Sequence, residues 1–453
     1  MDQTKNKIQQ IGLITAIAIV SANMIGTGVF TSLGFQVGSI SSGFTIICLW
    51  FVGGLTALCG AFSYGELSAA MPRSGGEYHL LSRIFHPAVG FTAGWISVAV
   101  GFTAPIAAAA MAMGKYATEV LIDFQLIDQA DQGMFITLLG LATVTFVTII
   151  HTMNVKIVSS FQLIFTSLKI VLIFILIIAG LIVGKGSADF TPNKESIGAI
   201  FSAPFAISLI FVMYAYSGWN AATYIAGDIK NPGRNLPLSL FIGTLIVMIL
   251  YVALNGVFMY TTPVSEMVGK VEVGYIAANY ILGNQGAVIM GLLISLGLIS
   301  AISSMIWAGP RVTQIMGEDT KIFSFLSKKN KNGAPHVSLL LQYILVVIMI
   351  LTSSFDAIVS FIGFTLSISA FLTVLGVYIM RHKAPEMNRP YKTWGYPFTP
   401  AFFLLVTGWM LFYVVKGKPL ESMAGLVVIA MGLGLYYLDQ YVKKGKEKNQ
   451  TLK

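Results

Sequence analysis

The fold is decided by a glycine interruption in the first long apolar stretch, Ser21-Ala22-Asn23-Met24-Ile25-Gly26-Thr27-Gly28-Val29-Phe30. A second interruption lies five apolar stretches further on and reads Tyr214-Ala215-Tyr216-Ser217-Gly218-Trp219-Asn220. Either motif alone is also explained by close helix packing, which glycine permits. Interruptions in corresponding positions of two halves instead predict internal repeats with a binding site near the middle of the bilayer. Because five is odd, the second repeat is expected to be inverted.

Composition places the chain in a bilayer. Of its 453 residues, 56% are hydrophobic and only 10% are charged, and the mean hydropathy is +0.79. A soluble domain carries about 25% charged residues. At about 20 apolar residues per transmembrane helix, the chain has room for about twelve. The expected spans are 11–36, 43–70, 87–116, 133–151, 157–184, 200–226, 237–260, 285–316, 337–353, 357–380, 398–416 and 421–441.

We therefore predict an all-α integral membrane protein with about 12 transmembrane helices, a 5+5 inverted repeat with broken helices 1 and 6, and two extra helices. The expected units are a short N-terminus (1–10), the first repeat (11–184), the second repeat (200–380), helices 11 and 12 (398–441) and a tail (442–453). No loop is long enough for a soluble nucleotide-binding domain, so an ATP-driven pump is not expected.

The distribution of basic residues predicts the orientation. Alternate loops on the side of the N-terminus hold 21 of the 28 Lys and Arg residues. One more lies inside a span, and the opposite loops hold only Lys115, Lys185, Lys194, Lys270, Lys416 and Lys418. By the positive-inside rule, both termini of this multi-pass protein are expected in the cytoplasm, with the chain in the cell membrane. The formal charge of +9 is thus explained by loops and does not indicate a nucleic-acid partner.

Catalytic and metal-binding motifs are not evident in the sequence. It shows no phosphate-binding glycine loop, no His-Glu-x-x-His motif and no metal-ligand spacing of histidines. Cys48 and Cys59 lie eleven residues apart in one expected helix, about 16 Å by axial rise, so a disulfide between them is not expected. We expect neither an enzyme nor a cofactor or metal.

The two interruptions suggest what they bind. An unwound helix in lipid leaves amide donors and carbonyl acceptors that need partners. Amides at the start of the half-helix after the first break suit a carboxylate, and carbonyls at the second break suit an ammonium group. The expected substrate-binding residues are Gly26, Thr27, Gly28, Tyr214, Ala215 and Ser217.

Lys169 is the one basic residue in the middle of a predicted span, roughly 18 Å from its start by helical rise. Such a lysine costs about 2.5–3.5 kcal/mol on insertion scales, so it should face the protein interior. The expected partners are carbonyls of the first break and the hydroxyls of Ser303 and Ser304. A purely structural ammonium is the alternative. Because a buried lysine gives up its proton more readily, proton coupling stays open.

Two acids flank a basic residue after the second span. Glu66 and Glu77 lie on either side of Arg73, and ion pairs with it are the simplest expectation. No acidic side chain then remains near either interruption, which favours neutral substrates. A cationic amino-acid or polyamine carrier, which should have an acid in its pocket, is the rival, and a non-transporting membrane sensor of amino acids is another.

Several of these motifs carry a family resemblance. The stretch 26–30, the loop Met71-Pro72-Arg73-Ser74-Gly75-Gly76-Glu77-Tyr78 and the stretches 214–220 and 228–237 resemble the amino acid–polyamine–organocation superfamily. They are most similar to its L-type amino acid transporter branch and bacterial relatives.

The resemblance implies alternating access and amino-acid substrates. It places Tyr214 as an aromatic gate, and it places Lys169, beside Ser303, where sodium binds in sodium-coupled relatives. Transport would then be sodium-independent, by exchange, proton symport or facilitated diffusion. Gly227 departs from the branch, which often has an acid there, so a charge pair at the inner gate is weakened. The segment 115–132 lacks cysteine, so a disulfide-linked heavy subunit is not expected.

Overall fold

The chain folds into a bundle of long helices. The computed structural model describes residues 11–153, 158–184, 186–331 and 333–451, so the whole of the expected N-terminal segment 1–10 and parts of the loops lie outside the described residues. Short α-helices and 3₁₀ or π turns connect the long ones, and no strand occurs in the described ranges. The helices are α1 (Leu13–Met24), α2 (Gly28–Thr31), α3 (Leu33–Gln36), α4 (Gly43–Ala70), α5 (Gly76–Ile84), α6 (Pro87–Ile96), α7 (Thr103–Asp123), α8 (Gln132–Met153), α9 (Val158–Val183), α10 (Lys194–Ala199), α11 (Ala203–Tyr216), α12 (Pro232–Thr261), α13 (Val264–Met267), α14 (Val273–Asp319), α15 (His336–Thr352), α16 (Phe355–Lys383), α17 (Phe398–Gly417) and α18 (Pro419–Thr451).

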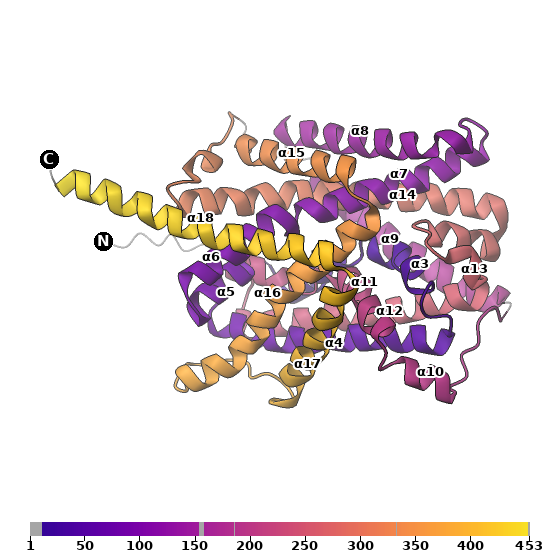
Figure 1. The fold of residues 1–453 in the computed structure, drawn as a ribbon, viewed down its shortest axis with the longest axis horizontal. Helices are drawn as coiled ribbons and strands as arrows, with labels where there is room; N and C mark the ends of the chain where they lie inside the picture. Colours follow the sequence, from indigo (N-terminus) through magenta and orange to yellow (C-terminus); the bar gives the residue numbers. More distant parts are fainter. Residues whose placement is uncertain (1–10, 154–157, 185, 332, 452–453) are drawn as a thin grey trace.

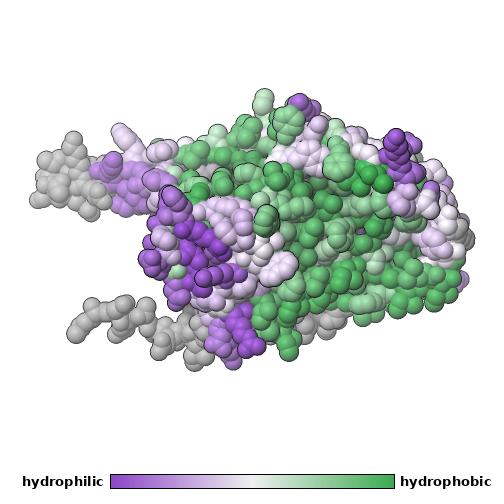
Figure 2. Space-filling model, turned by 90° about the horizontal axis from the view of Figure 1, so that it is seen from below, coloured by the Kyte–Doolittle hydropathy of each residue, from purple (hydrophilic) through white to green (hydrophobic). Residues whose placement is uncertain are grey.

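The helices have the length and surface of membrane spans. Ten helical segments of the described chain are long and apolar enough to cross a bilayer, and two shorter apolar helices, 168–183 and 336–352, complete the predicted set. Most of the long helices, among them α4, α7, α8 and α14, run roughly along one direction, whereas α16 and α17 lie obliquely to them (Figure 1). Figure 2 shows hydrophobic residues over the middle of the molecule and hydrophilic residues gathered at its ends. The prediction of an all-α membrane protein is confirmed.

Helices one and six are both interrupted at the expected glycines. α1 ends at Met24 and α2 begins at Gly28, and α11 ends at Tyr216 before a 3₁₀ segment, η3 (Ala221–Asp228). A β-carbon on Gly28 would fall on the backbone of Ala215. Gly218 has a φ of +96°, and a β-carbon there would lie 2.9 Å from the carbonyl of Asn23. The two interruptions therefore pack main chain against main chain, which only glycine allows at these positions.

The remaining spans pack around the interrupted pair. α4 packs along α12, and α7 packs along α14, so the second and third spans of each expected repeat lie against their counterparts. α17 and α18 are the least buried of the long spans besides α8, and α18 runs across the outside of the bundle (Figure 1). This arrangement leaves the two interruptions at the centre of the bundle, enclosed by α4, α7, α12, α14 and α16.

The start of the first span is bonded to the end of the sixth. Ile11 and Ile229 form an isolated parallel backbone bridge. The Ile11 amide donates to the carbonyl of Asp228 at 3.1 Å, and the Lys230 amide donates to the Ile11 carbonyl at 2.9 Å. The loop after α4 reaches the same region, because the Ser74 hydroxyl accepts a hydrogen bond from the amide of Gly227 at 3.2 Å.

Candidate functional site

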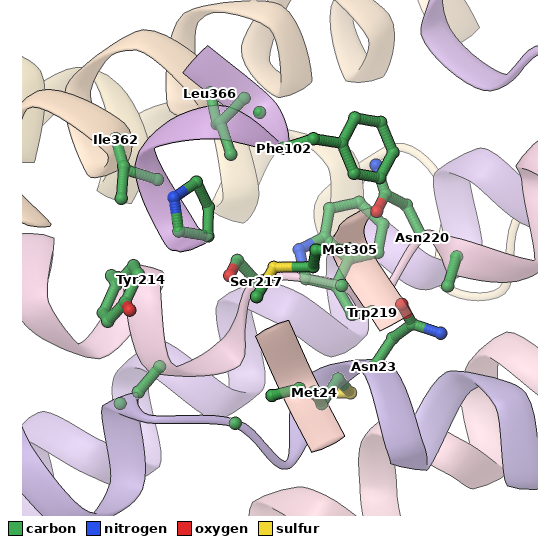
Figure 3. A pocket seen from close by; sticks show the side chains of 18 of the residues that line it. Asn23, Met24, Phe102, Tyr214, Ser217, Trp219, Asn220, Met305, Ile362 and Leu366 are labelled. Carbon is green, nitrogen blue, oxygen red and sulfur yellow. The ribbon is translucent and has the colours of Figure 1, made fainter. Parts of the chain in front are cut away.

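The two interruptions enclose a cavity of about 210 Å³. All six predicted substrate-binding residues line it, as do Lys169 and Ser304, whereas Ser303 does not. Figure 3 shows Tyr214, Ser217 and Asn220 from the second interruption around this space, facing Asn23 and Met24 from the first. Apolar side chains from α14 and α16 and from the turn before α7 close it, among them Met305, Ile362 and Phe102. The cavity thus has a polar main-chain wall and an apolar wall.

The first interruption supplies amide donors. In the described chain, the amides of Thr27, Gly28 and Val29 donate to no carbonyl or side chain, because the helix before them has ended and the next has only begun. Unpaired backbone N–H groups away from water are rare and costly. Three consecutive free donors at the start of a helical segment form a site suited to an anion.

The second interruption supplies carbonyl acceptors. Among the described hydrogen bonds, none reaches the carbonyls of Ala215 and Ser217, whereas the Tyr214 carbonyl accepts the amide of Ser217 at 3.0 Å. Of the three expected ammonium ligands, Ala215 and Ser217 therefore have unoccupied oxygens. Tyr214 contributes differently, through its phenol, which lies 2.5 Å from the hydroxyl of Thr27.

Lys169 on α9 reaches the first interruption. Its side chain is 3% exposed, and its ammonium donates to the carbonyl of Ile25 at 2.8 Å. The stem of Lys169 packs where α14 has Gly297, at which a β-carbon would lie 3.0 Å from the lysine Cγ. The lysine ammonium thus supplies a hydrogen-bond donor to a carbonyl that the ending of α1 leaves without its helical donor.

The hydroxyls expected beside Lys169 have other partners. Ser303 lies 2.9 Å from Nε2 of His151 on α8, and Ser304 donates to the Ser300 carbonyl one turn earlier in α14. The predicted contact of Lys169 with Ser303 and Ser304 is therefore wrong in this conformation. Gly297 is the residue of α14 that contacts the lysine stem, and Ser303 and Ser304 lie six and seven positions further along this helix, about 9–10 Å away by axial rise.

The comparisons with known proteins fit this geometry. The model of the family described as "Amino acid permease" matches residues 11–433. The chain belongs to this amino acid permease family.

The permease is similar along nearly its whole length to animal amino-acid transporters. It is 26% identical over 456 residues to the b(0,+)-type amino acid transporter 1 of Mus musculus, covering 98% of this chain and 90% of that protein. It is 27% identical over 440 residues to the large neutral amino acids transporter small subunit 2 of Oryctolagus cuniculus, covering 96% and 81%. It is 26% identical over 445 residues to the cystine/glutamate transporter of Homo sapiens, covering 96% and 85%. The permease is thus a multi-pass membrane transporter of amino acids and not an enzyme.

Glu77 is a cavity residue of the permease that sequence reasoning missed. The carboxylate is 5% exposed and lines the cavity. Its Oε1 accepts hydrogen bonds from the Tyr64 hydroxyl at 2.5 Å and from the Asn220 amide at 3.1 Å. Burial raises the pKa of this carboxyl from 4.5 to about 7, although both hydrogen bonds act in the opposite direction.

The ion pairs expected with Arg73 are wrong for both acids. Glu66 is bonded instead to Arg381, with the closest atoms 2.6 Å apart, and Glu77 points into the permease away from the loop. The turn before α5 explains the direction of Glu77. Gly75 and Gly76 have φ angles of +127° and +52°, and a β-carbon on Gly76 would lie 2.6 Å from the Tyr224 ring. The signal for this direction in the sequence was the glycine pair, because two consecutive glycines predict a turn that packs closely against a neighbouring segment.

Proposed function

We propose that the permease carries α-amino acids by holding their carboxylate at the first interruption and their ammonium group at the second. The free amides of Thr27, Gly28 and Val29 are the observation that carries the proposal. The unoccupied carbonyls of Ala215 and Ser217 line the same cavity and complement them. A zwitterion satisfies both sets at once, which removes the cost of leaving buried main chain unpaired.

Transport is sodium-independent in this proposal. The ammonium of Lys169 already occupies the Ile25 carbonyl, an oxygen of the kind that a bound sodium ion needs. Two unit charges about 4 Å apart repel by about 4 kcal/mol even at an effective dielectric of 20. Exchange, proton symport and facilitated diffusion are all compatible with this arrangement, and each uses alternating access around a site at the centre of the bundle.

The proposal includes the membrane orientation and the assembly. Both termini lie in the cytoplasm, on the evidence of the basic loops. The name of one relative calls it a small subunit, but a disulfide-linked heavy subunit is not expected for this permease. Its two cysteines, Cys48 and Cys59, both lie on α4, inside a span.

Uptake into proteoliposomes tests the proposal. Purified permease, reconstituted with unlabelled leucine inside, should accumulate labelled leucine by counterflow, equally well in sodium and in choline buffer. Isoamylamine, which is leucine without its carboxylate, should not compete, because the free amides would have no anion to bind. Equal competition by leucine and isoamylamine would refute the binding model, and strict sodium dependence would refute the role of Lys169.

The same preparation separates the carrier from a non-transporting sensor, the alternative that the sequence alone leaves open. The cavity would serve it equally well, because binding requires the same main-chain groups. Leucine binding in detergent without any counterflow in proteoliposomes would favour the sensor, whereas both together favour the carrier.

A further inference from the structure

In the part of the permease that the structure describes, buried acids are paired with basic side chains, with one exception. Among the described residues, four carboxylates are nearly fully buried, with exposed fractions of 1% to 5%. Three of them have a cation within 4 Å, and Glu77 has none. Glu66 pairs with both Arg381 and Arg389, Glu272 pairs with Lys115, and Asp439 pairs with Lys443.

A buried carboxylate without a cation is costly. Removing an ionised carboxylate from water carries a penalty of several kcal/mol, which hydrogen bonds only partly offset. The groups that face Glu77 are neutral: the phenols of Tyr64 from α4 and Tyr224 from η3, and the amide of Asn220. The two recorded hydrogen bonds both reach Oε1. Both donors are neutral, and none of the described groups that face Glu77 supplies a counter-ion.

The cavity gives a cationic group access to Glu77. Glu77 lines the same cavity as Gly28 and Ser217, and the residue that bonds it, Asn220, follows Ser217 by only three positions. A substrate with its α-groups at the two interruptions must direct its side chain elsewhere in this cavity. The rings of Phe102, Trp219 and Tyr224 also line it and suit the methylene stem of a long side chain.

We propose that Glu77 determines substrate specificity by pairing with a cationic side chain, so that the permease takes lysine- or ornithine-like amino acids in addition to neutral ones. This inference rests on the proposed binding of the α-groups at the interruptions. It corrects the expectation of a cavity without an acid, which was the reason for favouring neutral substrates alone. A polyamine, which lacks a carboxylate, would leave the free amides of the first interruption unpaired and is not favoured.

The test compares lysine with norleucine, which has a similar stem without the charge. The measured quantity is the ratio of kcat/KM for lysine to that for norleucine in counterflow at pH 7.5. Wild-type permease should transport both, and Glu77→Gln should lower the ratio at least tenfold. Glu272→Gln is the matched control, because it removes a buried acid that does not line the cavity, and its ratio should equal that of the wild type. Thermal denaturation in detergent shows whether each variant is folded.

A second measurement needs no variant. In wild-type permease the same ratio, or the ratio of affinities in detergent, should fall by roughly tenfold between pH 8 and pH 6, because Glu77 takes up a proton there. Norleucine transport without lysine transport, an unchanged ratio in Glu77→Gln, or a ratio independent of pH would each overturn this proposal. If wild-type permease transported neither lysine nor norleucine, that result would overturn the proposed function as well as this proposal.

Discussion

The hydroxyl of Thr27 lies 2.5 Å from the phenol oxygen of Tyr214 and joins the two interrupted helices across 187 positions of sequence. Both side chains are almost fully buried, with exposed fractions of 6% and 4%. The contact lies directly beside the free amides of the first interruption and the free carbonyls of the second. It therefore fixes the distance between the two groups of main-chain ligands.

The first prediction concerns this contact. Tyr214→Phe and Thr27→Val should each weaken leucine binding about fivefold, as expected for losing about 1 kcal/mol from one buried hydrogen bond. The double variant should be no weaker than either single variant, because both remove the same bond. Binding in detergent measures all three. Additive losses would show that the two hydroxyls act independently. Tyr214→Ala should weaken leucine binding more than Tyr214→Phe, because it also removes the ring.

The second prediction separates two glycines of the first interruption. A β-carbon on Gly26 would meet only the Met24 carbonyl, at 3.9 Å, whereas one on Gly28 would fall on the Ala215 backbone. Gly26→Val should therefore fold normally and lose substrate binding, because its side chain occupies the cavity. Gly28→Ala should lower thermal stability as well, so its loss of binding cannot be read as an effect on the site alone. Denaturation curves with and without leucine distinguish the two outcomes.

The third prediction concerns Lys169. Lys169→Ala removes the donor to the Ile25 carbonyl and opens volume near Gly297. Leucine counterflow should fall at least tenfold, while leucine affinity in detergent should change by less than threefold, because the lysine does not touch the proposed α-group ligands. A loss of affinity equal to the loss of transport would place Lys169 in the binding site itself. Lys169→Arg keeps the charge and, if the lysine carries a proton, should abolish any stimulation of uptake by acidic pH.

The fourth prediction concerns stability and pH. The raised pKa of Glu77, about 7 against 4.5 when unfolded, means that the folded permease favours the protonated acid. This contribution to stability is fully present below about pH 4.5 and is lost as the pH rises through about 7. Glu77→Gln should thus match the wild type near pH 4 and exceed it near pH 8, by at most about 3 kcal/mol. Thermal denaturation at the two pH values measures the difference, and a wild type that is more stable than the variant at pH 8 would contradict it.

The sequence predicted the features that follow from hydrophobicity and from glycine. The helical spans, the two interruptions and their contact could be predicted because unwound backbone in a bilayer needs glycine and a partner. The position of Lys169 against a carbonyl of the first interruption follows from the same physical requirement. Ser303 was misplaced, because the rotation of α14 depends on packing against neighbouring helices, which one sequence does not reveal.

Glu77 shows the other limit of sequence reasoning. Arg73 is its nearest basic residue in sequence, and pairing neighbours of opposite charge is a reasonable first expectation. The direction of the side chain depends instead on the backbone angles of Gly75 and Gly76 and on the space left by Tyr224. Glu66 was misassigned for a related reason, since its partner Arg381 lies 315 positions away.

The bridge between Ile11 and Ile229 constrains how the transporter can open. Two backbone hydrogen bonds join the beginning of the first span to the extended segment after η3 and hold these parts together. A path from the cavity to this end of the molecule cannot form by separating them unless both bonds break. We therefore expect the path to open between this bonded pair and α5, which requires the hydrogen bond from the Gly227 amide to the Ser74 hydroxyl to break. In that motion Glu77 would leave Asn220 and meet water, and a cation held between them would be released on that side.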